Sequence, residues 1–501
     1  MDCFDPNSKK GAESLSAIRQ NTLSPTPLTR TSLMKNACNS LILVPVVLGL
    51  TLSNAAGVAQ PELRERVRLA WTAQLTHRSA GYGVVLGGLG APVDWVEPNL
   101  ADALGIGIDI RNPKTEDWFN ADGNIYGRPE REISLHWRGR EIANRRAPVD
   151  LQGDVAISVN LRAVTGGSEL TLRAGGALVY DRTFVPDLRP VATAPRTGGD
   201  ARIGPVTWRA SGRRVARETP VRVAAFRREL NNSSRHEWRA PANFTGIPGS
   251  VGRVVATLRL DPTPEGLDKW DRIGQIWVVN PQGERFELLR YMTPYRRAWE
   301  WRVDVTDCLP LFQGQPNFEG RCETYGEGWL VSLDLDFYPG QIRPTPFAIQ
   351  NLWNGSPVIG QASAPLTDFF RPLPITAPAG TRRTVVRTLV TGHGMEPNAK
   401  NAAEFLPLWR EIRVNDTVWR DSLWKADNDL NPCRPQGGTW KFDRAGWGPG
   451  DVVSPWSVDI TRALVRGAGT LNYAVEPYEN FTPAPGNPAR HIVGSQVIFY
   501  R

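Results

Sequence analysis

Three acidic residues stand beside aromatic residues, where a carboxylate could do proton chemistry. They lie in the runs Lys269-Trp270-Asp271-Arg272, Cys322-Glu323-Thr324-Tyr325 and Ala403-Glu404-Phe405. A positioned carboxylate can accept or donate a proton during hydrolysis, which accelerates the reaction by about a hundred- to ten-thousand-fold. Each run alone indicates little, because a tryptophan beside a surface ion pair or a solvated glutamate is the more common case. Their meaning depends on what the rest of the chain places around them.

A stretch near the C-terminus has the composition of a binding loop. It runs from Asn431 to Gly450 and combines many glycines and prolines with Trp440, Trp447 and the pair Asp443-Arg444. Glycine and proline favour a looped backbone over a helix or a regular strand. A long ordered loop with aromatic and charged residues is more often a binding or active-site loop than a connector. The composition does not name a ligand.

Alternation of apolar and polar residues predicts that β-strands position these residues. In the second half of the chain it runs through residues 253–260, 274–279, 285–290, 329–337, 382–390 and 496–500. Such a period of two is typical of half-buried strands, and no long amphipathic helix interrupts it. We therefore predict two β-rich blocks, residues 218–355 and 356–501.

An earlier block, residues 60–217, also alternates. Strands are predicted at residues 103–110, 132–137, 154–161, 169–173 and 176–180, whereas residues 60–75 are expected to form a short helix or an arm and residues 209–220 a linker. This succession resembles the concanavalin-like or laminin-G-like β-sandwich, through Gly105–Arg111, the Asp122-Gly123-Asn124 loop and residues 194–204. A plain antiparallel sandwich and a carbohydrate-binding one both remain open, because fold does not dictate function.

The N-terminal region has the layout of an export signal. An apolar run, Leu41–Leu52, follows Lys35 and precedes small residues up to Ala59. The run is too short for a comfortable membrane span and is typical of a signal peptide, with cleavage near Ala55–Ala59. Residues 1–59 are thus an extension plus signal, with Met1 or Met34 as the start. We expect a secreted or periplasmic bacterial protein that has no membrane attachment after cleavage.

Composition argues against metal, cofactor or nucleic acid. The exported chain would keep Cys308, Cys322 and Cys433. Cys308 and Cys322 could close one loop by a disulfide, but the sequence does not decide this. No C-x-x-C, H-x-H or H-E-x-x-H spacing occurs, so we predict no metal and no cofactor. The net charge of +8 comes from scattered basic residues, which indicates a solvated surface rather than a nucleic-acid site. A monomer is expected.

The order of several short motifs carries a more specific signal. These motifs are Trp270-Asp271-Arg272, Thr293-Pro294-Tyr295, Asp304-Val305-Thr306-Asp307 and Asp443-Arg444-Ala445-Gly446-Trp447. Over about residues 218–501 the chain resembles the bacterial peptide-N-glycosidase F family, secreted amidases that cut N-linked glycans from asparagine. The resemblance implies an all-β fold of two consecutive jelly rolls, with the active site at their interface. Here this pair is preceded by the lectin-like sandwich.

The resemblance also implies roles for individual residues. Asp271 matches the essential aspartate, and Glu323 and Glu404 match two supporting glutamates. Arg272, Arg444 and Trp447 match residues that contact the substrate, and Tyr325, Phe405 and His393 stand where the family has tryptophans of the glycan cleft. Our hypothesis is that Asp271 transfers a proton with a water that Glu323 orients, while Glu404, Arg272 and Arg444 hold the N-acetylglucosamine and the peptide amide. Three neighbouring carboxylates should raise at least one pKa.

The chain departs from the family at its cysteines. Gly448 stands in place of a cysteine, and the cysteine pair around Glu404 is absent. We therefore expect the Asn431–Gly450 loop to be held by turns and packing, without a disulfide.

Three other functions compete with the amidase. The main alternative is a non-catalytic secreted glycan-binding protein with the same fold, and the three intact carboxylates argue against it. A copper monooxygenase lacks its metal ligands, because the two blocks contain only His236, His393 and His491. An endoglycosidase would leave one N-acetylglucosamine on the asparagine, so the mass of the product distinguishes it from an amidase.

Overall fold

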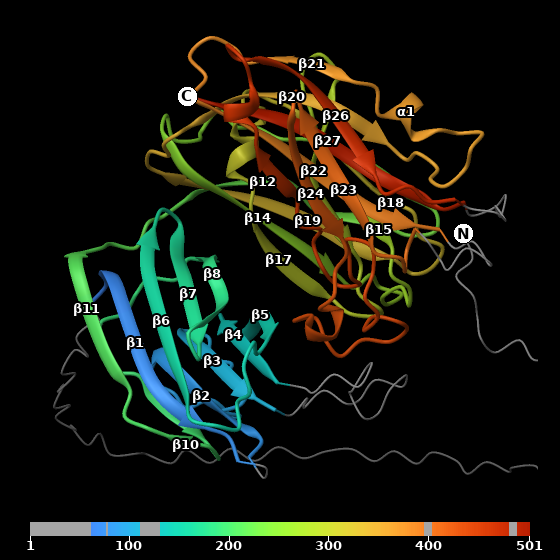
Figure 1. The fold of residues 1–501 in the computed structure, drawn as a ribbon. Coiled ribbons are helices and arrows are strands. Elements are labelled where there is room, and N and C mark those ends of the chain that lie inside the picture. The colour runs from blue at the N-terminus through green and yellow to red at the C-terminus, as the bar shows by residue number, and fades with distance from the viewer. Residues whose placement is uncertain (1–61, 77–78, 111–130, 395–402, 480–487) are drawn as a thin grey trace, which may run out of the picture. The chain divides into compact units, whose positions relative to one another are not determined.

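The chain folds into antiparallel β-sheets (Figure 1). The computed structural model describes residues 62–76, 79–110, 131–394, 403–479 and 488–501, which all belong to one compact unit, Pro61–Arg501. The proposed signal peptide, its cleavage site, both candidate start residues and the Asp122-Gly123-Asn124 loop lie outside the described residues.

The N-terminal block contains two sheets packed around one core. The first sheet has the order β10 (Arg202–Ile203), β1 (Arg64–Gln74), β6 (Val155–Val164), β7 (Gly167–Ala174) and β8 (Ala177–Pro186), and β11 (Thr207–Arg214) also pairs with β1. The second has the order β5 (Arg140–Arg146), β4 (Glu132–Trp137), β3 (Ala103–Asp109), β2 (Gly81–Gly87) and β9 (Arg196–Gly199). Buried aliphatic side chains from both sheets, including Leu69, Ile108 and Leu161, form the core between them. The specific likeness to concanavalin-like or laminin-G-like sandwiches stays a prediction.

Two local predictions in this block were wrong. Residues 60–75 are neither a helix nor an arm, because they contain strand β1, in which Val67, Leu69 and Trp71 are buried and alternate with exposed residues. Residues 209–220 are not only a linker, since strand β11 continues to Arg214. Arginine and small residues made β11 look like a connector, but as an edge strand it needs only backbone pairing with β1.

The middle of the chain forms an eight-stranded jelly roll. One of its sheets has the order β12 (Val221–Asn231), β19 (Trp329–Pro339), β14 (Val251–Asp261) and β17 (Trp299–Asp304). The other has the order β13 (Glu237–Pro241), β18 (Asn317–Cys322), β15 (Ile273–Val279) and β16 (Arg285–Met292). The first and last strands pair with each other, as in a double Greek key. The core includes Phe244, Phe312 and Phe337.

The C-terminal strands repeat this topology. One sheet has the order β20 (Pro346–Gly355), β27 (Arg490–Tyr500), β22 (Arg383–His393) and β25 (Trp456–Asp459), and the other has β21 (Leu373–Thr376), β26 (Ala468–Val475), β23 (Leu408–Val414) and β24 (Thr417–Leu423). The predicted all-β fold with a pair of jelly rolls is therefore confirmed. The helical segments of the described residues are short: α1 (Leu366–Phe369), η1 (Thr306–Leu311), η2 (Asn428–Leu430) and η3 (Thr461–Ala463). Within these residues no helix has the length and apolarity that a membrane crossing requires.

Strand β16 joins the two jelly rolls through buried polar contacts. Arg290 is fully buried, donates two hydrogen bonds to Glu287 over 2.7–2.8 Å and donates to the carbonyl of Ile492 on β27 over 2.7 Å. From β22, Arg387 donates to the carbonyls of Glu287 and Leu288. A small apolar cluster of Met292, Leu389, Trp447 and Val453 lies at the same junction. These contacts hold the two jelly rolls in register beside the predicted site residues.

Candidate active site

Asp271 lies in a short segment before β15 that two neighbouring side chains hold in place. The buried carboxylate of Asp268 accepts the backbone N–H of Trp270 over 3.0 Å. The hydroxyl of Thr293 accepts the backbone N–H of Arg272 over 2.7 Å and donates to the carbonyl of Trp270 over 3.2 Å. The backbone on both sides of Asp271 is thus fixed, and 10% of the Asp271 side-chain surface remains exposed. Asp268 was not singled out from the sequence, and Thr293 entered only as part of the Thr293-Pro294-Tyr295 motif.

Glu404 and Arg444 come from the C-terminal jelly roll and meet beside Asp271. The Nε of Arg444 donates to Oε1 of Glu404 over 3.2 Å, and its Nη2 lies 3.9 Å from Oδ2 of Asp271. A backbone hydrogen bond from Ala445 to the carbonyl of Glu404 over 2.9 Å aligns the two segments. Gly392 allows this approach, because a Cβ at that position would lie 1.7 Å from the carbonyl oxygen of Ala403. The structure therefore brings the carboxylates of both jelly rolls to one buried guanidinium.

The guanidinium of Arg444 is enclosed by hydrogen bonds and rings. It donates to the carbonyl of Phe442 over 2.9 Å and to the hydroxyl of Thr439 over 2.7 Å. It lies 4.7 Å from the ring centroid of Trp447 and 5.2 Å from that of Phe405. Only 1% of its side-chain surface is exposed. This geometry fixes the position of the charge between Glu404 and Asp271.

Trp447 is packed as a supporting residue. Its indole N–H donates to the carbonyl of Gly392 over 2.8 Å, and its ring stacks on His393 with centroids 5.1 Å apart. Trp447 is 5% exposed, and His393, which is 6% exposed, accepts or donates a hydrogen bond to Thr391 over 2.8 Å. The Trp447 ring therefore packs between Arg444 and His393, and the two rings leave almost no surface exposed to a ligand.

Burial sets the protonation states of two groups in this cluster. Burial, together with the negative charge of Asp271, raises the pKa of Glu404 to about 7, against the opposing effect of Arg444. Burial and the surrounding positive charges of Arg290 and Arg490 hold the pKa of His393 well below its usual range, so its imidazole is neutral. Glu404 is thus the carboxyl whose charge changes near neutral pH. This agrees with the expectation that at least one of the three carboxyl groups has a raised pKa.

Glu323 and Tyr325 occupy a more exposed position, and Arg272, with 10% of its side chain exposed, lies beside Tyr325. Glu323 is about half exposed and lies 3.5 Å from Arg321, and Tyr325 is 54% exposed. The guanidinium of Arg272 lies 5.3 Å from the Tyr325 ring centroid and 3.6 Å from Asp268, and its Nε makes no hydrogen bond within the described residues. No direct contact joins Glu323 to Asp271 or Glu404 among the interactions of the described residues. Arg272 and Tyr325 are accordingly the better placed of the predicted residues to touch a ligand.

The Asn431–Gly450 loop is held without a disulfide. The side-chain amides of Asn431 and Gln436 both donate to the carbonyl of Pro449 over 2.8 Å. The side-chain amide of Asn428 donates to the carbonyls of Phe442 and Trp447. Within the described part of the chain Cys308 and Cys322 are free thiols and Cys433 forms no disulfide, so the possible Cys308–Cys322 bridge does not exist. The side chain of Asn428 fills the space beside Gly448, where the family has a cysteine.

A buried arginine in the same loop reaches the N-terminal block. Arg434 is 0% exposed at its side chain and donates to Glu141 over 2.6 Å and to Glu132 over 2.7 Å. Burial opposes its charge, but the surrounding carboxylates raise the pKa of Arg434 above its usual value. These residues were missed because they lie about three hundred positions apart in the chain. The only sequence signal is an arginine inside a loop of low aliphatic content.

Comparison with known proteins connects this arrangement to one family. Residues 366–496 match the family model described as "Peptide-N-glycosidase F, C terminal". The chain is 26% identical over 264 residues to peptide-N(4)-(N-acetyl-beta-D-glucosaminyl)asparagine amidase F of Elizabethkingia miricola, and the matched region covers 50% of this chain and 73% of that protein.

Two solved structures are also similar. A crystal structure of peptide-N(4)-(N-acetyl-beta-D-glucosaminyl)asparagine amidase is 22% identical with a TM-score of 0.50, covering 56% of this chain and 96% of that one. A structure of PNGF-II is 12% identical with a TM-score of 0.45, covering 87% and 98%. The first likeness bears on the fold alone, and the second is too low to support an argument. Residues 366–496 therefore match the model of the C-terminal part of peptide-N-glycosidase F, and the chain resembles that protein over about half of its length.

Proposed function

We propose that this chain is a secreted amidase that hydrolyses the amide bond between asparagine and the first N-acetylglucosamine of N-glycoproteins or glycopeptides. One observation carries the proposal: Asp271 from one jelly roll and Glu404 from the other converge on Arg444. The similarity to an amidase of this specificity supports the substrate class. The products are a glycosylamine and an aspartate in place of the asparagine.

The proposed reaction begins with an attacking water. Asp271 takes a proton from this water as its oxygen bonds to the amide carbon of the asparagine side chain. The carbon–nitrogen bond then breaks as Asp271 returns this proton to the nitrogen, which leaves as the glycosylamine. Glu323 is assigned to orienting the water. Because Glu323 is about half exposed, it would approach a water near Asp271 from the solvent side.

Arg272 and Arg444 have different proposed roles. Arg272 keeps unused N–H donors beside Tyr325, so we assign it to the substrate amide or the developing oxyanion. Arg444 and Trp447 are almost fully buried, so we assign them to positioning Glu404 and Asp271. Glu404 holds the N-acetylglucosamine, and Phe405 and Tyr325 are proposed to border the sugar. His393 supports Trp447 from behind.

The domain organisation is part of the same proposal. We propose that residues 60–217 form a lectin-like sandwich and linker, and that residues 218–355 and 356–501 form the two domains of the amidase. The separate hydrophobic cores of the three blocks support these boundaries. Export through the signal at Leu41–Leu52 would deliver the enzyme to the glycoproteins outside the cell.

The deciding experiment compares Asp271→Asn with the unmodified chain on a denatured glycoprotein and on a glycopeptide. Mass spectrometry of the peptide should show conversion of asparagine to aspartate with the unmodified chain and none with Asp271→Asn. Asp416→Asn, which changes an exposed aspartate, is the matched control and should keep full activity. Release of glycan by Asp271→Asn would overturn the assignment. A peptide that retains one N-acetylglucosamine would identify an endoglycosidase, and glycan binding without cleavage would identify a non-catalytic protein.

A further inference from the structure

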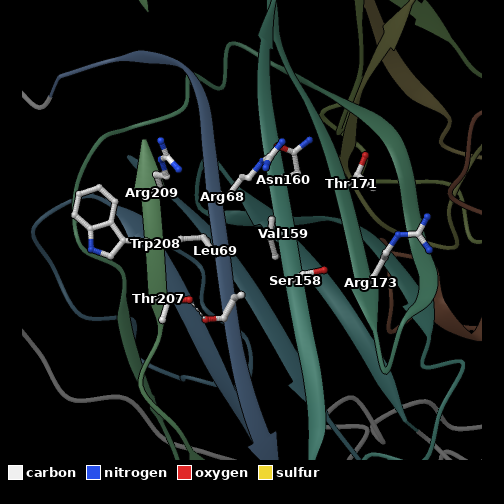
Figure 2. Close-up of a pocket in the computed structure, with 11 residues that line it drawn as sticks. Arg68, Leu69, Ser158, Val159, Asn160, Thr171, Arg173, Thr207, Trp208 and Arg209 are labelled. Atoms are coloured by element: carbon white, nitrogen blue, oxygen red, sulfur yellow. Dashed lines mark hydrogen bonds between the residues drawn. The ribbon is translucent and has the colours of Figure 1, made fainter. Parts of the chain in front are cut away.

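The first sheet of the N-terminal block, which contains β1 and β11, carries a depression on its solvent face (Figure 2). Its volume is about 450 Å³, and it spans strands β11, β1, β6 and β7. It is lined by Arg68, Asn160, Thr171, Arg173, Trp208 and Arg209, with smaller residues between them. None of these residues belongs to the candidate active site.

The strand register gathers these side chains into rows. Arg209, Arg68 and Asn160 are successive partners across β11, β1 and β6, and Thr171 on β7 completes the row. In the next row Thr207, Ala70, Ser158 and Arg173 are paired in the same way. Because alternate residues of a strand point to the same face, both rows face solvent together. Ala70 is small and leaves room between the polar side chains.

The arginines in the depression lack carboxylate partners, unlike several other arginines of the same sheet. On the same sheet, Arg162 and Arg182 both pair with Glu169, and Arg214 pairs with Glu62. In contrast, Arg68 and Arg209 are exposed and make no ion pair or side-chain hydrogen bond in the described residues, while Arg173 donates only to the carbonyl of Gly176. This leaves an excess of positive charge in the depression, which is complementary to an anion.

One further side chain of this face, Asn160, suits a sugar, whereas Trp208 pairs with the buried Leu69 and belongs to the opposite face of the sheet. The Oδ1 of Asn160 is buried and makes no hydrogen bond within the described residues. A buried acceptor without a donor is costly, and a sugar hydroxyl can supply one. The positive charge and the acceptor without a donor thus occur in one place.

We propose that this face binds an acidic oligosaccharide, namely a sugar chain that carries a carboxylate and belongs to the glycoprotein substrate. The guanidinium groups of Arg68 and Arg209 would bind the carboxylate, because guanidinium donors match carboxylate oxygens in pairs. Asn160 and Thr171 would contact the neutral sugars next to it. The choice of a glycoprotein as the source rests on the proposed function, whereas the complementarity to an acidic sugar does not. The face would retain substrates with acidic glycans near the enzyme.

The test measures binding of two free sugars to the full chain by calorimetry. The probes are 3′-sialyllactose, which carries one carboxylate, and lactose, its neutral core. We expect 3′-sialyllactose to bind at least about tenfold more tightly than lactose. The double variant Arg68→Gln/Arg209→Gln should lose this difference, and Asn160→Ala should weaken the binding of both sugars. The matched control, Arg217→Gln/Arg382→Gln, removes the same charge from two other exposed arginines and should bind like the unmodified chain.

Each result bears on the inference separately from the amidase activity. Equal affinity for the two sugars, unchanged binding by the double variant, or equally tight binding of inorganic triphosphate would overturn it. The double variant should cleave a short neutral glycopeptide at the normal rate, since its changes lie outside the proposed active site. If the chain cleaves no glycopeptide but binds 3′-sialyllactose through Arg68 and Arg209, the proposed function fails and the acidic-sugar site stands. If the chain cleaves glycopeptide without such binding, the proposed function stands and the acidic-sugar site is overturned.

Discussion

The Nε of Arg444 donates a hydrogen bond to Oε1 of Glu404 over 3.2 Å, and the backbone of the next residue, Ala445, donates to the carbonyl of Glu404. The backbone hydrogen bond therefore places the two charged side chains next to each other, so their pairing does not rely on side-chain conformation alone. Thr439 and Phe442 hold the remaining side of the guanidinium. The position of the Arg444 charge is thus fixed before a substrate binds, between Glu404 and the second carboxylate, Asp271.

Replacing Arg444 should damage stability and activity together. In Arg444→Met the Glu404 carboxyl loses its buried partner, and breaking such a pair costs about 3–5 kcal/mol of unfolding free energy. In Arg444→Lys the charge remains, but the single nitrogen of an ammonium cannot replace the three separate nitrogens that now reach Glu404, Thr439 and Phe442. We expect kcat/KM to fall by about a hundredfold or more in both variants, with the larger loss of stability in Arg444→Met.

Urea unfolding and glycopeptide kinetics check this prediction. Arg413→Met is the matched control, because Arg413 forms a more exposed ion pair with Glu411 and its loss should cost less than about 1 kcal/mol. Normal kinetics in Arg444→Met would show that the buried arginine does not position the carboxylates.

The raised pKa of Glu404 predicts a specific pH dependence of stability. Below its ordinary value of 4.5 the carboxyl is protonated in both the folded and the unfolded chain. Between 4.5 and about 7 the unfolded chain releases the proton first, so the contribution of Glu404 to stability falls as pH rises and is constant above about 7. Glu404→Gln should remove this component. The difference in unfolding free energy between the unmodified chain and Glu404→Gln should therefore shift by about 3 kcal/mol from pH 4 to pH 8.

His393 provides the contrast in the same titration. Its pKa is lowered, so its contribution to stability is complete above the unfolded value of 6.5 and is lost as pH falls toward the folded value. Subtracting the curve of Glu404→Gln from that of the unmodified chain cancels this term. A difference that does not change with pH would contradict the buried, raised state of Glu404.

The sequence predicted the fold and the core of the candidate site for different reasons. The period-two pattern of β14, β15, β19 and β22 is local, so it identifies strands without knowledge of their partners. The convergence of Asp271, Glu404 and Arg444 followed from the resemblance of short motifs, because no local rule joins residues that far apart. The prediction for strand β1 was wrong because a single run of apolar and charged residues, seen without its pairing partners, also fits a short helix or an arm.

Burial inside the site was not readable from the sequence. Trp447 and Arg444 look like ligand-contacting residues, because an aromatic and a cation in a glycine-rich loop commonly are. In the fold their side chains stack on each other and are closed off by His393 and Thr439. Only the three-dimensional packing decides which of the charged residues of such a loop reach the surface.

Gly448 should tolerate a side chain poorly. A Cβ at residue 448 would lie 2.0 Å from Oδ1 and 2.7 Å from Cγ of Asn428. The Asn428 amide would then have to leave the carbonyls of Phe442 and Trp447, which it now binds. We expect Gly448→Ala to lower the unfolding free energy by about 2–4 kcal/mol, through overpacking and lost buried hydrogen bonds.

A double-mutant cycle with Asn428→Ala tests the cause. Since the clash needs both side chains, the destabilisation in the double variant should be clearly less than the sum of the two single effects. Gly249→Ala is the control, because a Cβ there would meet no atom within 4 Å. Additive single effects would show that Asn428 does not explain the requirement for glycine.

Arg434 should couple the N-terminal block to the loop that carries Arg444. In Arg434→Met, Glu132 and Glu141 lose the guanidinium that both contact, although each is no more than 3% exposed at its side chain. Removing the cation of a buried charge network costs about 3–5 kcal/mol, and the loop that contains Arg434 and Arg444 should loosen. We therefore expect a lower melting temperature and a reduced kcat on glycopeptide, with faster backbone hydrogen exchange across residues 431–450.

Arg145→Gln is the matched control, because Arg145 pairs with Asp427 at an exposed position and its loss should change stability by less than about 1 kcal/mol. If Arg434→Met melts earlier but keeps normal kcat and normal exchange in the loop, the buried cluster stabilises the fold without positioning the site.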